Sequence, residues 1–68
     1  MNTQKEILNV LEESDRWMDI YEICYALDSK YPIYDVRENL SQLWAKDFVM
    51  RTKVHNEHKY RIKREDRI

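Results

Sequence analysis

The spacing of the apolar residues changes at Phe48, and this change restricts the possible folds more than any other feature of the sequence. Before Phe48 the apolar residues recur every three or four positions, which is typical of amphipathic helices. After it, apolar and polar residues alternate, which is typical of strands. The chain has 68 residues, enough for one compact core. We therefore predict a single α+β domain over residues 1–68, with three helices followed by a two-stranded β-hairpin.

Two capping signals mark the starts of the first two helices. Thr3 and Glu6 have the spacing of a capping box, in which each side chain satisfies a backbone N–H group of the other residue. The first helix is therefore expected over about residues 3–13. Asp19 and Glu22 repeat the pattern, so the second helix is expected to start at Asp19.

A proline separates the second helix from the third. The residue before a proline avoids the helical conformation, so Pro32 closes a turn over residues 28–32. The third helix is expected over about residues 34–46. Its apolar residues fall within a narrow sector of the helical wheel, which predicts that they face the core. They are Val36, Leu40 and Leu43.

The two strands of the hairpin are expected over residues 48–54 and 59–63. In the second strand Tyr60 and Ile62 point to one side, and the basic residues between them point to the other. A polar tip is expected between the strands. It contains His55, Asn56, Glu57 and His58.

The first strand of the hairpin is less regular than the second. Alternation places Arg51 and Lys53 on the same side as Val49, and the sequence leaves open which side is buried. A short extended piece near Trp17 is available as a third strand. Residues 65–68 are expected to fray, as chain ends commonly do.

Positive and negative residues are distributed unevenly along the chain. Residues 1–45 contain four Lys and Arg against nine Asp and Glu, a net charge of −5, whereas residues 46–68 contain eight against four, a net charge of +4. The two parts sum to the −1 of the whole chain. Such a division indicates a surface that faces nucleic acid on an otherwise acidic protein. A solvated basic tail is the alternative.

Membrane proteins and secreted proteins are not expected from this sequence. No apolar run approaches the roughly 20 residues that a membrane-spanning helix needs, and the first residues lack the pattern of a secretory signal. A lone cysteine, Cys24, cannot form an internal disulfide, which favours a reducing, cytoplasmic setting. Its place on the apolar side of the second helix predicts a small buried hydrophobic residue rather than a redox sensor.

Catalytic and metal-binding sites are not expected either. The chain contains no glycine for a phosphate-binding loop and no recognisable serine–histidine–acid grouping, so we predict no enzyme activity and no cofactor or small-molecule ligand. His55 and His58 are too few to hold a structural zinc ion, which needs four ligands. They are interpreted as tip residues that donate to phosphate when protonated.

The segment VRENLSQLWAKDFVMR resembles the third helix and first wing strand of winged helix-turn-helix DNA-binding regulators. The matching positions are Val36, Arg37, Leu40, Leu43, Lys46, Asp47, Phe48, Val49 and Arg51. With the upstream helix, the turn and the hairpin, the resemblance covers roughly residues 3–64. In size and layout the chain is also similar to short bacterial pilus-operon regulators.

Two features depart from the pattern of that superfamily. The usual glycine after the third helix is replaced by Asp47, and the turn that contains Pro32 is about two residues longer. Asp and Asn tolerate the left-handed backbone conformation better than other residues with side chains. We therefore expect Asp47 at the helix end and Asn56 at the hairpin tip to adopt it, while the longer turn alters how the third helix is presented.

The resemblance implies a transcriptional regulator that places its third helix in the major groove of double-stranded DNA. Gln and Asn can read adenine there, and acidic side chains can accept from cytosine. The implied helix residues are Tyr34, Asp35, Arg37, Glu38, Asn39, Ser41, Gln42 and Lys46. The basic wing would contact the backbone, where neutralised phosphates release counterions. Its residues are Arg51, Lys53, His55, Asn56, His58, Lys59, Arg61 and Lys63.

Each of these surfaces has a simpler interpretation. The polar side of the third helix can be an ordinary solvated face, and charges on strand edges can serve to prevent edge-to-edge aggregation. A protein-interaction module is the alternative function, with a homodimer or a partner regulator as its target. Aromatic residues suit such a contact, and the predicted partner surface consists of Tyr21, Tyr25 and Trp44.

The DNA-binding hypothesis depends on one spatial relationship. The basic side chains of the last third of the chain must lie together, beside the polar side of the third helix, as one continuous surface. Cations that point to different sides, or that are neutralised by acids of the first 45 residues, would contradict it.

Overall fold

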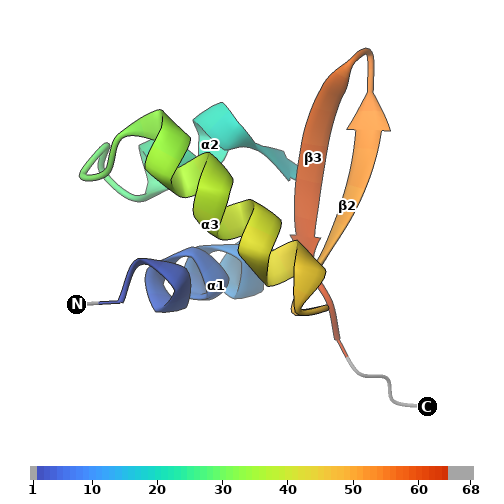
Figure 1. Cartoon of the computed structure of the whole chain (residues 1–68), viewed down its shortest axis with the longest axis horizontal. Coiled ribbons are helices and arrows are strands. Elements are labelled where there is room, and N and C mark those ends of the chain that lie inside the picture. The colour runs from blue at the N-terminus through green and yellow to red at the C-terminus, as the bar shows by residue number, and fades with distance from the viewer. Residues whose placement is uncertain (1, 65–68) are drawn as a thin grey trace.

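The computed structural model describes residues 2–64, which form three helices and a three-stranded antiparallel sheet (Figure 1). In chain order the elements are α1 (Thr3–Ser14), β1 (Met18–Asp19), α2 (Ile20–Ala26), α3 (Ile33–Ala45), β2 (Val49–Val54) and β3 (Glu57–Ile62). The predicted α+β class and the order of three helices before a hairpin are confirmed. The expected fraying of residues 65–68 lies outside the described residues.

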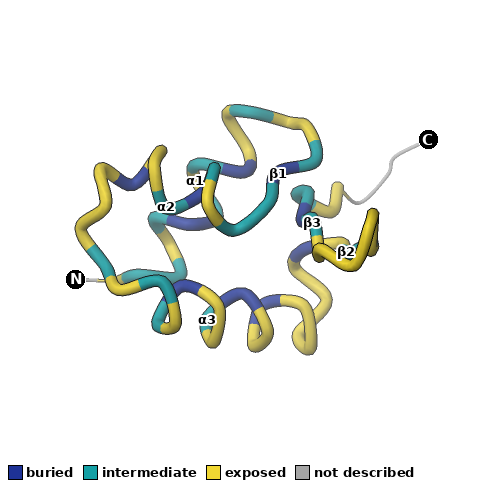
Figure 2. The backbone as a smooth tube through the Cα atoms, turned by 90° about the horizontal axis from the view of Figure 1, so that it is seen from above, coloured by how far each residue is buried: buried dark blue, intermediate teal, exposed yellow. Residues whose placement is uncertain are grey.

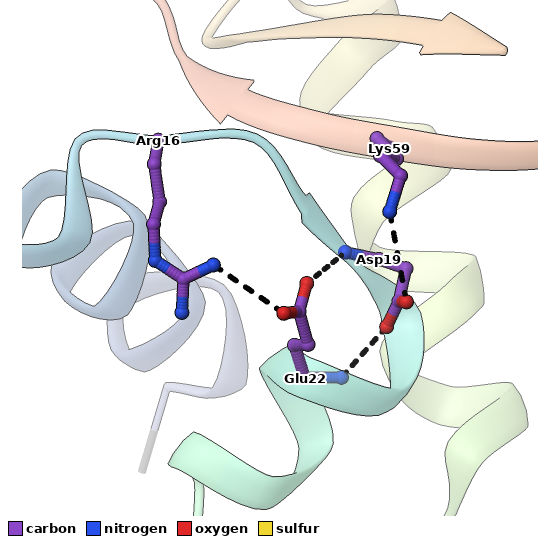
Figure 3. Close-up of polar contacts among 4 residues, drawn as sticks. All are labelled: Arg16, Asp19, Glu22 and Lys59. Carbon is purple, nitrogen blue, oxygen red and sulfur yellow. Dashed lines mark hydrogen bonds and ion pairs between the residues drawn. The ribbon is translucent and has the colours of Figure 1, made fainter. Parts of the chain in front are cut away.

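The cap predicted for the second helix is present. The Asp19 carboxylate accepts from the backbone N–H of Glu22 at 2.9 Å, and the Glu22 carboxylate accepts from the backbone N–H of Asp19 at 2.9 Å (Figure 3). Met18 precedes the cap and Ile23 lies in the first full turn of α2, and both are buried. The box therefore fixes the start of α2 and directs its apolar side to the core.

The cap predicted for the first helix is wrong by one residue. The N-cap of α1 is Asn2, whose side-chain oxygen accepts from the backbone N–H of Lys5 at 3.1 Å. Glu6 makes tertiary contacts instead, because the turn after α2 lies within its reach. It accepts from the Tyr31 hydroxyl at 3.0 Å and pairs with Lys30 at 3.0 Å.

Non-glycine residues take the left-handed conformation at the turns of this glycine-free chain. Asp47 follows α3 with φ 71°, as predicted, and Asn56 at the hairpin tip has φ 66°. His55 also has a positive φ of 52°, so the hairpin turn contains only these last two residues. Two positive φ values are typical of a type I′ turn. The predicted four-residue tip is therefore wrong, since Glu57 already belongs to β3.

The short extended piece before α2 joins the sheet. Met18 of β1 lies opposite Tyr60, and Asp19 lies opposite Lys59. This confirms the third strand, one residue later than Trp17. The strand order is β1-β3-β2, so β3 is central and β2 forms one edge.

The core lies where the three helices meet the base of the sheet. In Figure 2 the buried segments of α3 face α1, α2 and the strands, while its other side is exposed. The predicted core residues of α3 are all buried. The full set of buried residues is Ile7, Leu11, Met18, Ile23, Leu27, Val36, Leu40, Leu43, Val49 and Tyr60.

Candidate nucleic-acid interface

The register of the hairpin decides which side of β2 is buried. Directly opposed residues share one face of a sheet, and three opposed pairs share a face here: Val49 with Ile62, Arg51 with Tyr60, and Lys53 with His58. Val49 and Tyr60 are buried against the helices. We call this side the inner face of the hairpin, and it carries Arg51 and Lys53.

The opposite side of the hairpin, its outer face, carries the cations of β3. The outer-face residues are Met50, Thr52, Val54, Glu57, Lys59 and Arg61. Lys59 Nζ lies 3.8 Å from Asp19 Oδ2 (Figure 3), and Arg61 Nη2 lies 3.8 Å from Asp15 Oδ1. Both acids belong to the first part of the chain, so they offset these two positive charges.

The cations that follow β3 are paired as well. Lys63 Nζ lies 2.7 Å from Asp47 Oδ2, and Arg64 Nε lies 3.4 Å from Asp15 Oδ1. The expectation of one continuous cationic surface is therefore wrong. Strand alternation sends the cations to two faces of the hairpin, and aspartates beside the sheet pair with those of the outer face and the hairpin base.

The lysines and arginines without an ion pair occupy a different part of the molecule. Within residues 2–64 they are Lys5, Arg37, Lys46, Arg51 and Lys53. All but Lys5 lie on α3, at its C-terminal end, or on the inner face of β2. The unpaired lysines and arginines, which are available to bind an anionic ligand, are thus concentrated on α3 and the adjoining face of the hairpin.

The predicted contact residues of α3 divide into two groups. Tyr34, Arg37, Glu38, Ser41 and Lys46 are exposed. The other three residues are less accessible to a ligand. Asp35 and Asn39 are half-buried, and Asn39 and Gln42 lie toward α1. Gln4 of α1 donates to the side-chain oxygens of Asn39 at 3.1 Å and Gln42 at 2.8 Å.

Asn39 is further committed within its own helix. Its amide donates to the backbone carbonyl of Asp35 at 2.8 Å, and the side chain is half-buried. A residue whose donor and acceptor are both engaged inside the protein is poorly placed to read a base edge. No signal in the sequence indicated that Gln4 would reach across to this side of α3.

A hollow of about 350 Å³ lies between the start of α2, α3 and the inner face of the hairpin. Its walls combine basic, polar and aromatic side chains. They are Asp19, Ile20, Tyr21, Arg37, Ser41, Arg51, Asn56, Glu57, His58 and Tyr60. The structure thus places Arg37 and Ser41 of the third helix around the same hollow as Arg51, Asn56 and His58 of the hairpin.

The tip of the hairpin is fully open to solvent. His55, Asn56 and His58 are exposed, and the His58 ring meets the Tyr60 ring edge-on at 6.5 Å between centroids. Within residues 2–64, no three His, Cys, Asp or Glu side chains lie close enough together to hold a metal ion. The polar donors of the tip are therefore available to a ligand outside the chain.

The three aromatic residues predicted as a partner surface lie on two helices, α2 and α3, and all three are exposed. Tyr21 and Tyr25 are 63% and 83% exposed and line a shallow hollow beside the end of α1. Trp44 lines neither hollow and lies at the end of α3, where the guanidinium of Arg51 covers its ring. Tyr34, on α3, is a further exposed aromatic residue at 65%.

Cys24 lies on the partly buried side of α2 and packs against the core. Burial raises the pKa of its thiol, and the positive charge of Arg37 opposes that shift. The thiol therefore stays protonated at neutral pH, which is the state of a small packing residue.

No helix in residues 2–64 has the length and apolar character needed to cross a membrane. Comparison with protein-family models, with curated proteins and with solved structures finds no match to this chain.

Proposed function

We propose that this chain is a small winged helix-turn-helix regulator that binds double-stranded DNA through the concave side formed by α3 and the inner face of the hairpin. In this proposal α3 is the recognition helix and the β2–β3 hairpin is the wing. The continuous cationic surface on which the DNA-binding hypothesis depended is divided between two faces and partly neutralised. A narrower observation therefore carries this proposal, and it is the distribution of unpaired cations. Outside α1, the Lys and Arg of residues 2–64 that lack an ion pair lie on α3, at its end, or on the inner face of β2.

Electrostatics supports the choice of the inner face of the hairpin, and not its outer face, as the side that binds DNA. Phosphate contacts supply most of the sequence-independent affinity for DNA, because each neutralised phosphate releases a counterion. A cation that already neighbours a carboxylate releases fewer counterions, since the acid stays beside it. Lys53 on the inner face is therefore an effective phosphate contact, whereas Arg61 beside Asp15 is not.

Base recognition in this proposal relies on a short set of α3 side chains. Ser41 is exposed on the side that faces the hollow, and a serine hydroxyl can hydrogen-bond to several base edges. Glu38 is exposed and without an ion pair in the described part of the chain, so it is free to accept from a cytosine amino group. Asn39 and Gln42 contribute less, because Gln4 engages them.

The test is a mobility-shift titration with a duplex of about 20 base pairs at several salt concentrations. Lys53→Gln and Arg61→Gln form a matched pair, since each removes one positive charge from the hairpin. We expect Lys53→Gln to weaken binding and to reduce the slope of log K against log salt by about 1, while Arg61→Gln leaves both near the wild-type values. Equal losses in the two variants, or no duplex binding by the wild type, would contradict the proposal.

A self-association surface on α2 is the second candidate function. The observation that favours it is the exposure of Tyr21 and Tyr25, which lie one helical turn apart. Tyr side chains are enriched at the centres of protein interfaces. Sedimentation equilibrium separates the candidates. Loss of a dimer in Tyr25→Ser but not in the control Tyr34→Ser, without duplex binding by the wild type, would select this function.

A further inference from the structure

We propose that the hollow between α2, α3 and the hairpin is a phosphate seat, in which the guanidinium groups of Arg37 and Arg51 bind a phosphate group. The inference deepens the proposed function, because a duplex docked on this side would present its backbone phosphates to the hollow. The seat is inferred only from the residues that line the hollow. A free phosphate monoester would therefore supply the phosphate group equally well.

The size of the hollow fits a small anion with a short organic attachment. Its volume is about 350 Å³, near the lower end of the range for small-molecule sites. Ile20 and the buried ring of Tyr60 contribute apolar surface to it. The remaining wall is mostly made of side chains that can donate hydrogen bonds.

Two arginines from different elements line the hollow. Arg37 comes from α3 and Arg51 from the inner face of β2. Neither guanidinium has a carboxylate partner within residues 2–64. A pair of such forks matches the geometry of phosphate oxygens better than ammonium groups do.

Arg51 is held in place before any ligand arrives. Its guanidinium carbon lies 3.7 Å from the centroid of the Trp44 ring. Stacking on an aromatic face occupies the flat side of the group and leaves its N–H edge free. Less conformational entropy is therefore lost when that edge binds an anion.

Two acids line the hollow beside the two arginines, and they offset the positive charge only in part. The carboxylate of Asp19 caps α2 at 2.9 Å and lies 3.8 Å from Lys59, so its negative charge is already engaged. Glu57 is the other acid of the wall, and it has no ion pair within residues 2–64, so its carboxylate offsets part of the positive charge. Ser41, Asn56 and His58 add neutral or cationic donors to the two arginines.

Titration of the whole chain with inorganic phosphate, followed by ¹⁵N–¹H NMR at constant ionic strength with chloride as the balancing ion, tests the seat. We expect shifts confined to residues that line the hollow. Arg37→Gln should weaken phosphate binding about tenfold, because one charge-assisted contact is lost. The matched control Lys5→Gln, which removes an exposed unpaired cation of α1, should leave it unchanged.

Arg51→Lys is a second variant that keeps the charge but loses the planar fork, and it should also weaken phosphate binding. Shifts spread evenly over all basic residues, or equal effects of Arg37→Gln and Lys5→Gln, would overturn the seat. Chemical shifts of core residues such as Leu40 report whether each variant keeps its fold.

A second arm with a 20-base-pair duplex distinguishes the source of the phosphate. If phosphate fills the hollow and displaces the duplex, the seat takes a backbone phosphodiester. If phosphate fills the hollow and the wild type binds no duplex, the seat stands for a free monoester and the proposed function fails. Duplex binding without any phosphate shifts in the hollow would overturn the seat and leave the proposed function standing.

Discussion

The guanidinium carbon of Arg51 lies 3.7 Å from the centroid of the Trp44 ring. Trp44 is at the C-terminal end of α3 and Arg51 is on the inner face of β2, so the contact joins the helix to the hairpin. The guanidinium shields part of the Trp44 ring, which is still 44% exposed and lies outside the buried core.

A double-mutant cycle of Trp44→Leu and Arg51→Met measures the stack. Both substitutions keep apolar bulk while they remove the ring or the charge. Partly exposed cation–π contacts contribute about 0.5–1 kcal/mol, so we expect a coupling free energy of that size in urea unfolding. Additive losses in the double variant would show that the two residues stabilise the fold independently.

The hairpin turn should be improved by residues that suit its backbone. His55 and Asn56 both have positive φ, the conformation for which type I′ turns prefer Asn followed by Gly. We expect His55→Asn/Asn56→Gly to stabilise the fold by about 1 kcal/mol, because it relieves backbone strain at both positions. Differential scanning calorimetry should show Tm rising by about 4–8 °C.

Asn56→Val provides the opposite change at the same position. A β-branched residue is strained at positive φ, so this variant should lower Tm. A rise in Tm, or no difference between the Gly and Val variants, would contradict the turn geometry.

The cap of α2 can be separated from the ion pair that shares its aspartate. Asp19 accepts from the Glu22 backbone and lies 3.8 Å from Lys59. Asp19→Ala removes both contacts and should cost about 1 kcal/mol of unfolding free energy. Asp19→Asn keeps the cap and removes only the charge, so its loss should be smaller, as exposed ion pairs contribute about 0–1 kcal/mol. Equal losses would mean that the ion pair, not the cap, stabilises α2.

Local features of the fold were predictable from the sequence. The capping box at Asp19, the core-facing residues of α3, and the left-handed positions Asp47 and Asn56 each depend on a few neighbouring residues, and each is present. The cap of α1 was missed because Asn2 and Thr3 are both good N-cap residues, and the local sequence does not choose between them.

The arrangement of charges was not predictable, because it depends on tertiary contacts. Which side of β2 is buried follows from the pairing of Val49 with Ile62, residues from two different strands. The neutralisation of Arg61 depends on Asp15, far away in the sequence, at the left-handed end of α1. The distribution of charge along the chain therefore indicates one basic surface, whereas the register of the sheet places its cations on two faces.

Glu6 should make stability depend on pH. Hydrogen bonds from Lys30 and from the Tyr31 hydroxyl lower the pKa of Glu6 in the folded chain below its ordinary value of 4.5, since they favour the charged carboxylate. Because the pKa of Glu6 is lowered in the folded chain, its carboxylate stabilises the fold, and this stabilisation is complete at pH values above the ordinary pKa. That contribution disappears as the pH falls through the folded-state pKa, because the folded and unfolded chains are then both protonated.

The variant Glu6→Gln removes this titration and should flatten the acid limb of a plot of unfolding free energy against pH. Its stability should fall below that of the wild type at pH 7 and approach it once the pH has fallen below the folded-state pKa, where the wild-type carboxyl is neutral as well. Glu13→Gln on the same helix is the matched control, since Glu13 is exposed and has no ion pair within residues 2–64. Urea unfolding at several pH values measures both. If the Glu6→Gln curve runs parallel to the wild-type curve from pH 7 to pH 2, the contacts of Glu6 with the α2–α3 turn do not stabilise the folded chain.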